Sequence, residues 1–214
     1  MSVEVKICGL KTPAALEAAL AGGADYVGLV FFPPSPRSVT PETAAALAAK
    51  ARGRASIVAL TVDPDDDLLD TIVAAAAPDL IQLHGEETPE RVAEIRARWG
   101  RRIIKAVPVE TAGDVEAARR YQAVADLVLF DARAPATSTR PGGNGAPFDW
   151  RSLLGLDDGL PFVLSGGLTP DNVVDAIRLT GAAVVDVSSG VESRPGEKDP
   201  DLIRRFLRAA KGVV

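Results

Sequence analysis

Short, almost continuously apolar runs alternate with longer alanine-rich segments along the whole chain. Runs that do not alternate between apolar and polar residues are typical of strands buried on both faces of a parallel sheet. Eight runs have this character: Val3–Cys8, Tyr26–Phe31, Ser56–Val62, Leu80–Leu83, Ile103–Val107, Leu127–Phe130, Phe162–Leu164 and Ala183–Val187. The pattern therefore predicts eight parallel strands separated by helices.

Five of the segments between the runs begin with a capping residue followed by proline, a pair that favours a helix start. These pairs are Thr12-Pro13, Thr40-Pro41, Thr88-Pro89, Thr169-Pro170 and Asp199-Pro200. The helices that they predict cover Ala14–Ala21, Thr43–Ala51, Arg91–Trp99, Asn172–Leu179 and Asp201–Lys211.

Eight strand–helix units in 214 residues leave about 27 residues for each unit, enough for a parallel crossover. An open doubly wound sheet and a closed barrel both accept this pattern. We favour closure, because the count is eight and no run is typical of an edge strand. The predicted fold is a single α/β domain over residues 1–214, a (β/α)8 TIM barrel. Its longest irregular stretch, Ala132–Pro147, is glycine-rich and is interpreted as a binding loop.

Composition narrows the class of protein. The 24 basic and 29 acidic residues give a net charge of −5, which argues against nucleic acid or a membrane surface as partner. One Cys and one His exclude an internal disulfide and a zinc site rich in these residues. No apolar run reaches the roughly 18 residues that span a bilayer, and the amino terminus lacks a signal-peptide pattern. We expect a cytoplasmic protein, either a monomer or a homodimer.

Active sites of (β/α)8 barrels form at the carboxyl ends of the strands. After the seventh and eighth runs stand Ser165-Gly166-Gly167 and Ser188-Ser189-Gly190. Glycine lets the backbone approach phosphate oxygens, and serine adds a hydroxyl donor. Turns of this composition are also simply tight connections. Because both occupy the two positions where such barrels commonly bind phosphate, we predict a phosphate site there and a small phosphate ester as ligand.

Cys8 ends the first run, where its sulfur should face the site, although a free cysteine is often a small buried apolar residue. The alternation of side chains places Lys6 on the same face, one layer deeper. In a closed barrel the neighbouring eighth strand offers Asp186 as its partner. We predict a Lys6–Asp186 pair beneath Cys8 whose net field lowers the pKa of the thiol.

Three further side chains could carry chemistry. Asp131 follows a buried run, so that it is either a general acid or the cap of the next loop. Arg37 lies in a proline-rich loop, where it could bind a substrate carboxylate or form a surface ion pair. His84 is either a second proton carrier or a histidine satisfied at a strand end. Cys8 and Asp131, three strands apart around the ring, suggest an isomerisation by proton transfer.

The chain resembles the phosphoribosylanthranilate isomerases of tryptophan biosynthesis in an ordered set of motifs from residue 6 to residue 192. The matching segments are Lys6–Gly9, Phe32–Ser38, Gln82–Gly85, Leu129–Asp131, Gly142–Gly145, Phe148–Trp150, Ser165–Leu168 and Asp186–Glu192. One departure is Asn144, where the family pattern more often has Ser or Thr.

The resemblance implies an Amadori rearrangement without metal or cofactor, with Asp131 as general acid and Cys8 as general base. Arg37 would bind the anthranilate carboxylate of a sugar-phosphate substrate, and Gly166, Gly167, Ser189 and Gly190 would bind its phosphate. Gln82, His84 and Asp186 complete the set of candidate substrate-binding residues.

Other phosphate-binding barrels are the nearest alternatives. An indole-glycerol-phosphate synthase would need a catalytic lysine at a strand end, whereas Lys105 lies within the fifth run. A metal-dependent pentose-phosphate epimerase would need paired His and Asp ligands, and one His cannot supply two. A catalytically inactive barrel that binds a sugar phosphate as a regulator also stays open, although Cys8 and Asp131 at strand ends weigh against it.

Overall fold

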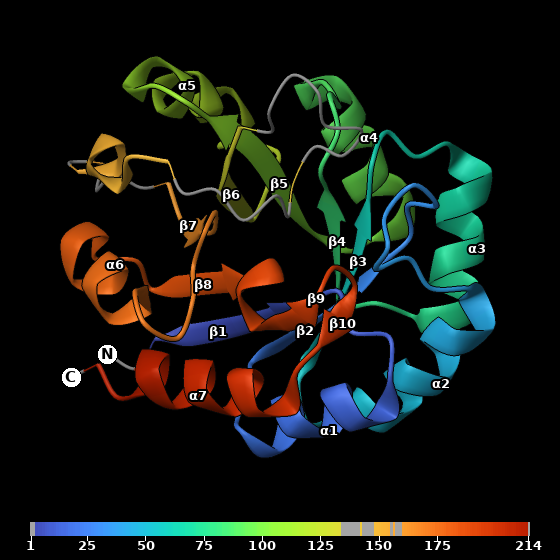
Figure 1. Cartoon of the computed structure of the whole chain (residues 1–214). Coiled ribbons are helices and arrows are strands. Elements are labelled where there is room, and N and C mark those ends of the chain that lie inside the picture. Colours follow the sequence, from blue (N-terminus) through green and yellow to red (C-terminus); the bar gives the residue numbers. More distant parts are fainter. Residues whose placement is uncertain (1–2, 134–141, 143–147, 155, 157–159, 214) are drawn as a thin grey trace.

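Eight parallel strands close into a barrel in the order in which they occur along the chain (Figure 1). The computed structural model describes residues 3–133, 142, 148–154, 156 and 160–213. The barrel strands are β1 Glu4–Cys8, β2 Tyr26–Val30, β3 Ser56–Thr61, β4 Leu80–Leu83, β5 Arg102–Val109, β6 Leu127–Ala132, β7 Phe162–Leu164 and β8 Val184–Val187. Hydrogen bonds between β8 and β1 close the ring. The prediction of a (β/α)8 barrel is confirmed, and the open sheet is excluded.

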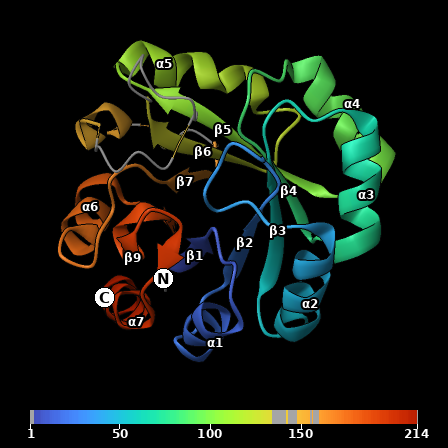
Figure 2. The same ribbon diagram turned by 45° about the vertical axis from the view of Figure 1, so that its right-hand side comes forward.

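Helices surround the barrel on the outside (Figure 2). They are α1 Pro13–Ala21, α2 Pro41–Ala51, α3 Asp66–Ala76, α4 Pro89–Trp99, α5 Ala112–Ala117, α6 Val173–Thr180 and α7 Pro200–Lys211. Short 3-10 helices cover η1 Ala118–Tyr121, η2 Trp150–Leu153 and η3 Ser189–Val191, and β9 Glu192–Arg194 pairs with β10 Glu197–Lys198 in a hairpin. Within the described part of the chain, no helix combines the length and apolar character needed to cross a membrane.

Four of the five predicted helix starts are confirmed. The side chains of Thr12, Thr40, Thr88 and Asp199 accept hydrogen bonds from the first turns of their helices, each with proline in the first turn. The helix predicted at Asn172–Leu179 is present as Val173–Thr180, but Thr169 does not cap it, because α6 begins only at Val173. There the side-chain oxygen of Asn172 accepts the backbone N–H of Thr169, which stabilises a turn before the helix.

Two helices lacked the proline signal and were not predicted. The carboxylate of Asp65 caps α3, and Thr111 with Asp114 forms a capping box at α5. Both devices satisfy the free N–H groups of a first turn without proline.

The same pair of hydrogen bonds occurs three times at the amino-terminal end of the barrel. An aspartate just before an even-numbered strand donates its backbone N–H to a carbonyl at the start of the preceding strand, and its carboxylate accepts that residue's N–H. These aspartate clamps are Asp25 on Val5, Asp79 on Ile57 and Asp126 on Ile103, with carboxylate distances of 2.7, 2.8 and 2.8 Å. Each clamp joins two neighbouring strands at this end of the barrel.

Replacing Asp126 by Ala should destabilise the barrel by about 1–3 kcal/mol, because the N–H of buried Ile103 loses its acceptor. Urea unfolding measures the difference in free energy. Asp175→Ala, which removes an exposed carboxylate from α6, is the matched control and should change little. Equal unfolding midpoints for the two variants would contradict the clamp.

Candidate active site

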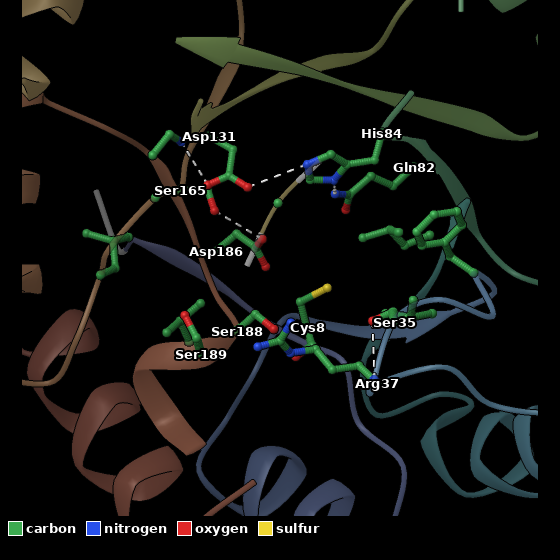
Figure 3. A pocket seen from close by; sticks show the side chains of 18 of the residues that line it. Cys8, Ser35, Arg37, Gln82, His84, Asp131, Ser165, Asp186, Ser188 and Ser189 are labelled. Carbon is green, nitrogen blue, oxygen red and sulfur yellow. Dashed lines mark hydrogen bonds and ion pairs between the residues drawn. The ribbon is translucent and has the colours of Figure 1, made fainter. Parts of the chain in front are cut away.

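The carboxyl ends of the strands surround one pocket (Figure 3). Nine of the ten predicted site residues line it: Cys8, Arg37, Gln82, His84, Asp131, Gly166, Gly167, Asp186 and Ser189. Gly190 does not. A Cβ built on Gly190 would lie 1.8 Å from the carbonyl oxygen of Leu168, so this glycine lets the turn after β8 pack against the turn after β7. Its predicted contact with a ligand stays a prediction.

Cys8 is the last residue of β1, and its sulfur points into the pocket (Figure 3). Its neighbour across the β1–β2 ladder is Gly28, where a Cβ would lie only 3.0 Å from the sulfur. Glycine at this place in β2 therefore makes room for the thiol. The side chain is buried, with 3% of its surface exposed.

The predicted pair beneath Cys8 is present. Lys6 Nζ donates to Asp186 Oδ1 at 2.9 Å, and the two residues are neighbours across the β1–β8 ladder. Burial alone would lower the pKa of Lys6, but Asp186 and Cys8 outweigh it and raise that pKa, so that Lys6 stays charged.

The field of this pair acts in the predicted direction, because Lys6 lowers the pKa of Cys8 more than Asp186 raises it, but the pKa is not lowered overall. Burial raises the pKa of the Cys8 thiol, and the opposing charges of Lys6 and Lys198 do not compensate. The carboxylate of Asp186 adds to the rise, because it disfavours a second negative charge beside it. Burial, and not the pair beneath the thiol, therefore keeps the pKa of Cys8 above its ordinary value.

Asp131 lies on β6 across the pocket from Cys8 (Figure 3). Its Oδ1 accepts the backbone N–H of Ala132 at 2.9 Å, and its Oδ2 lies 3.5 Å from His84 Nε2. Gln82 Nε2 lies 3.1 Å from His84 Nδ1. With the amide as donor, Nδ1 accepts and the neutral ring carries its proton on Nε2, which faces the carboxyl group.

This arrangement makes His84 part of the site. Its ring orients Asp131 and can stabilise a carboxylate there, and its two ring nitrogens face partners in the pocket. The 132–147 loop contributes as well, because a Cβ on Gly142 would lie 2.6 Å from both Asp131 Oδ2 and His84 Nε2. Only glycine fits so close to the pair. Residues 134–141 and 143–147 of that loop, including Asn144, lie outside the described residues.

Gln82 presents one atom that its surroundings leave unsatisfied. The residue is fully buried on β4 and lines the pocket, and its Oε1 has no hydrogen-bond partner within the described structure. A buried carbonyl oxygen without a donor costs free energy. Gln82 can therefore accept a hydrogen bond from a hydroxyl or N–H group of a ligand.

The turns after β7 and β8 lie side by side at one end of the pocket. Gly166 and Gly167 have φ angles of 83° and 70°, which other residues rarely adopt, and a Cβ on Gly166 would lie 2.7 Å from the backbone nitrogen of Ala132. Ser188 and Ser189 line the pocket from the other turn. This composition suits the oxygens of an anion such as phosphate.

Arg37 lies on the opposite side of Cys8 from His84 (Figure 3). Its guanidinium is buried, and Nε and Nη2 donate to the two carboxylate oxygens of Glu192 at 2.7 and 2.8 Å. An ion pair was one of the two interpretations of Arg37, but a surface position is wrong. The buried guanidinium lines the pocket in a fixed orientation.

Sequence reasoning missed two buried charges next to this site. Glu192 and Lys198 lie in the β9–β10 hairpin, with 4% and 2% of their side chains exposed, and Lys198 Nζ donates to Glu192 Oε1 at 2.6 Å. Glu192 belongs to a motif that the sequence analysis noted, but nothing local distinguishes Lys198 from a surface lysine. In the described part of the chain, no group of three or more His, Cys, Asp or Glu side chains is arranged to hold a metal ion.

Fold and pocket together define a barrel enzyme with acid and base candidates at the carboxyl ends of its strands. The sequence profile of the family described as N-(5'phosphoribosyl)anthranilate (PRA) isomerase matches residues 5–209. The N-(5'-phosphoribosyl)anthranilate isomerase of Rhodopseudomonas palustris (strain BisA53) is 60% identical over 213 residues, which are 100% of this chain and 98% of that protein. The chain therefore belongs to the N-(5'-phosphoribosyl)anthranilate isomerase family.

Solved structures agree with this assignment. The crystal structure of phosphoribosyl anthranilate isomerase from Thermotoga maritima superposes with a TM-score of 0.88 at 36% identity, covering 98% of this chain and 99% of that one. A phosphoribosyl anthranilate isomerase in complex with reduced 1-(o-carboxyphenylamino)-1-deoxyribulose 5-phosphate gives a TM-score of 0.85 with the same identity and coverage.

Proposed function

We propose that this chain converts N-(5'-phosphoribosyl)anthranilate to 1-(2-carboxyphenylamino)-1-deoxyribulose 5-phosphate in tryptophan biosynthesis. The observation that carries the proposal is the position of Cys8 and Asp131 on opposite flanks of one pocket. An aldose–ketose rearrangement needs an acid and a base that act on different atoms of the sugar, and the two flanks separate these groups.

The ends of the substrate would occupy opposite ends of the pocket. The guanidinium of Arg37 binds the anthranilate carboxylate, and Gly166, Gly167 and Ser189 bind the phosphate through backbone and hydroxyl donors. Gln82 Oε1 and the carboxylate of Asp186 accept hydrogen bonds from N–H or hydroxyl groups between the two ends. Holding both ends places the sugar ring between Cys8 and Asp131.

In the first step, protonated Asp131 gives its proton to the ring oxygen of the furanose. The bond between the anomeric carbon and that oxygen breaks, and the nitrogen lone pair forms the C=N bond of a protonated Schiff base. Asp131 becomes a carboxylate, which the Nε2–H of His84 stabilises from 3.5 Å. The hydrogen bond from Gln82 to Nδ1 keeps the ring in the tautomer that this requires.

In the second step, the thiolate of Cys8 removes the proton from the sugar C2. The electrons of that C–H bond form a C=C bond and neutralise the iminium nitrogen, which gives an enolamine. Tautomerisation, with loss of the enol proton and protonation of C1, yields the ketose. The positive charges of Lys6 and Lys198 favour the thiolate, against burial and the nearby carboxylate of Asp186.

Turnover by the purified chain tests the proposal. The labile N-glycoside is made in situ from anthranilate and a phosphoribosyl donor, and the ketose product is separated by chromatography. We expect product from the wild type and none above background from the folded double variant Cys8→Ala, Asp131→Asn. A folded wild type that forms no ketose would contradict the proposed function, and it would support the inactive, ligand-binding barrel.

A further inference from the structure

The β9–β10 hairpin places two buried charges between the predicted carboxylate and phosphate ends of the pocket. In Figure 1 the hairpin lies over the barrel near β1 and β2. Glu192 on β9 and Lys198 on β10 are almost completely covered, although the hairpin is a short two-stranded element at the surface. Removing these two charges from water costs free energy, which their contacts within the protein must offset.

Glu192 is surrounded by donors. Its Oε1 accepts from Arg37 Nε at 2.7 Å and from Lys198 Nζ at 2.6 Å, and its Oε2 accepts from Arg37 Nη2 at 2.8 Å and from the backbone N–H of Gly196 at 3.1 Å. Burial alone would raise the pKa of Glu192, but the hydrogen bonds and charges of Arg37 and Lys198 lower it to about 2. The carboxylate is therefore charged at all physiological pH values and fixes the plane of the guanidinium.

Lys198 extends the same chain of contacts to the other end of the pocket. Besides Glu192, its ammonium group donates to the carbonyl oxygen of Ser188 at 2.9 Å and to Ser188 Oγ at 3.2 Å. Ser188 Oγ in turn donates to the carbonyl oxygen of Cys8 at 3.2 Å. Ser188 begins the turn whose next residue, Ser189, lines the predicted phosphate end.

A second buried pair shows what a purely structural role looks like. Lys105 Nζ bonds Glu87 at 2.8 Å and the carbonyl oxygens of Gly85 and Ala106 at 2.7 and 2.9 Å. Neither Lys105 nor Glu87 lines the active-site pocket. Glu192, by contrast, contacts Arg37, and Lys198 contacts Ser188, and both of these residues line the pocket.

We propose that Glu192 and Lys198 are positioning residues that hold Arg37 and the Ser188–Ser189 turn at a fixed separation, so that the carboxylate and the phosphate of one substrate bind together. This inference rests on the proposed function. It assigns Glu192 mainly to the carboxylate end, through Arg37, and Lys198 mainly to the phosphate end, through Ser188.

Two fragments of the substrate test it: anthranilate, which carries the carboxylate, and ribose 5-phosphate, which carries the phosphate. Each is titrated as an inhibitor of turnover. Glu192→Gln should weaken inhibition by anthranilate about tenfold or more and inhibition by ribose 5-phosphate less, while Lys198→Met should show the reverse. In both variants KM should rise more than kcat falls.

Glu197→Gln is the matched control, because Glu197 lies on the same hairpin in an exposed pair with Arg194. It should leave both inhibition constants unchanged. The inference would be overturned if inhibition by the two fragments weakened equally in each variant, or if the inhibition constants matched those of the wild type. The proposed function would still stand in either case, provided that the wild type turns over. Absence of wild-type turnover would instead overturn the proposed function. If Glu192→Gln does not fold, Lys198→Met alone decides between the outcomes.

Discussion

Replacing Asp131 by Asn is expected to lower kcat about 10²- to 10⁴-fold and to change KM much less, because the amide has no proton to give to the ring oxygen. Asparagine has nearly the shape of aspartate, and its carbonyl oxygen can still accept the N–H of Ala132. The variant should therefore keep the pocket and lose only the acid. Steady-state turnover of phosphoribosylanthranilate measures the effect.

The matched control for this variant is Asp175→Asn, which makes the same chemical change at an exposed position on α6. It should keep wild-type kcat. A folded Asp131→Asn variant that retains kcat within a few-fold of wild type would contradict the role of Asp131 as general acid. A loss seen only in KM would assign the residue to substrate binding instead.

Replacing Cys8 by Ala is expected to cause the second large loss in kcat, again about 10²- to 10⁴-fold, because no base remains beside the sugar C2. The pH dependence distinguishes this loss from a packing defect. Burial raises the pKa of the thiol above its ordinary value of 9.0, and only the thiolate is a base. Since a higher pKa means less thiolate at neutral pH, the residual kcat/KM of Asp131→Asn, which has no acid that must stay protonated, should rise with pH.

The rise should approach tenfold per pH unit below the pKa of the thiol, and the residual rate of Cys8→Ala should lack this limb. Rates measured from about pH 6 to about pH 9 give the profile. An Asp131→Asn profile that falls with pH over this range would contradict a thiolate base. Val185→Ala in the Asp131→Asn background, on β8 beside β1 and outside the pocket lining, controls for the loss of a buried apolar group and should keep this limb.

Local signals in the sequence were enough to predict the barrel. Each predicted strand lies within two residues of the observed one, since a buried parallel strand needs an unbroken apolar run. The helix starts predicted from Thr-Pro and Asp-Pro were correct where the side-chain oxygen of the Thr or Asp accepts a hydrogen bond from the first turn. Thr169 failed because the decisive contact comes from Asn172, three residues later, which stabilises a turn instead.

The site was predictable where strand geometry alone sets the position of a side chain. Alternation along β1 and the closure of the ring are enough to bring Lys6 to Asp186. The pKa of Cys8 was not predictable in this way, because it depends on how completely the side chain is buried. The contact between Glu192 and Arg37 could not be predicted either, since the two residues are 155 positions apart and are brought together by loops without a periodic pattern.

The aspartate clamps divide the barrel into locally fastened pairs of strands: β1 with β2, β3 with β4, and β5 with β6. Ala183 stands at the corresponding position before β8 and offers no carboxylate, so that the last pair lacks this fastening. The acid and the base lie in different pairs, and the turns predicted to bind phosphate follow the two unclamped strands. A chain with every clamp formed but β8 not yet docked on β1 would be well folded by most spectroscopic criteria and still inactive. Activity depends on this unclamped part of the ring as well, because Lys6 of β1 meets Asp186 of β8 beneath Cys8.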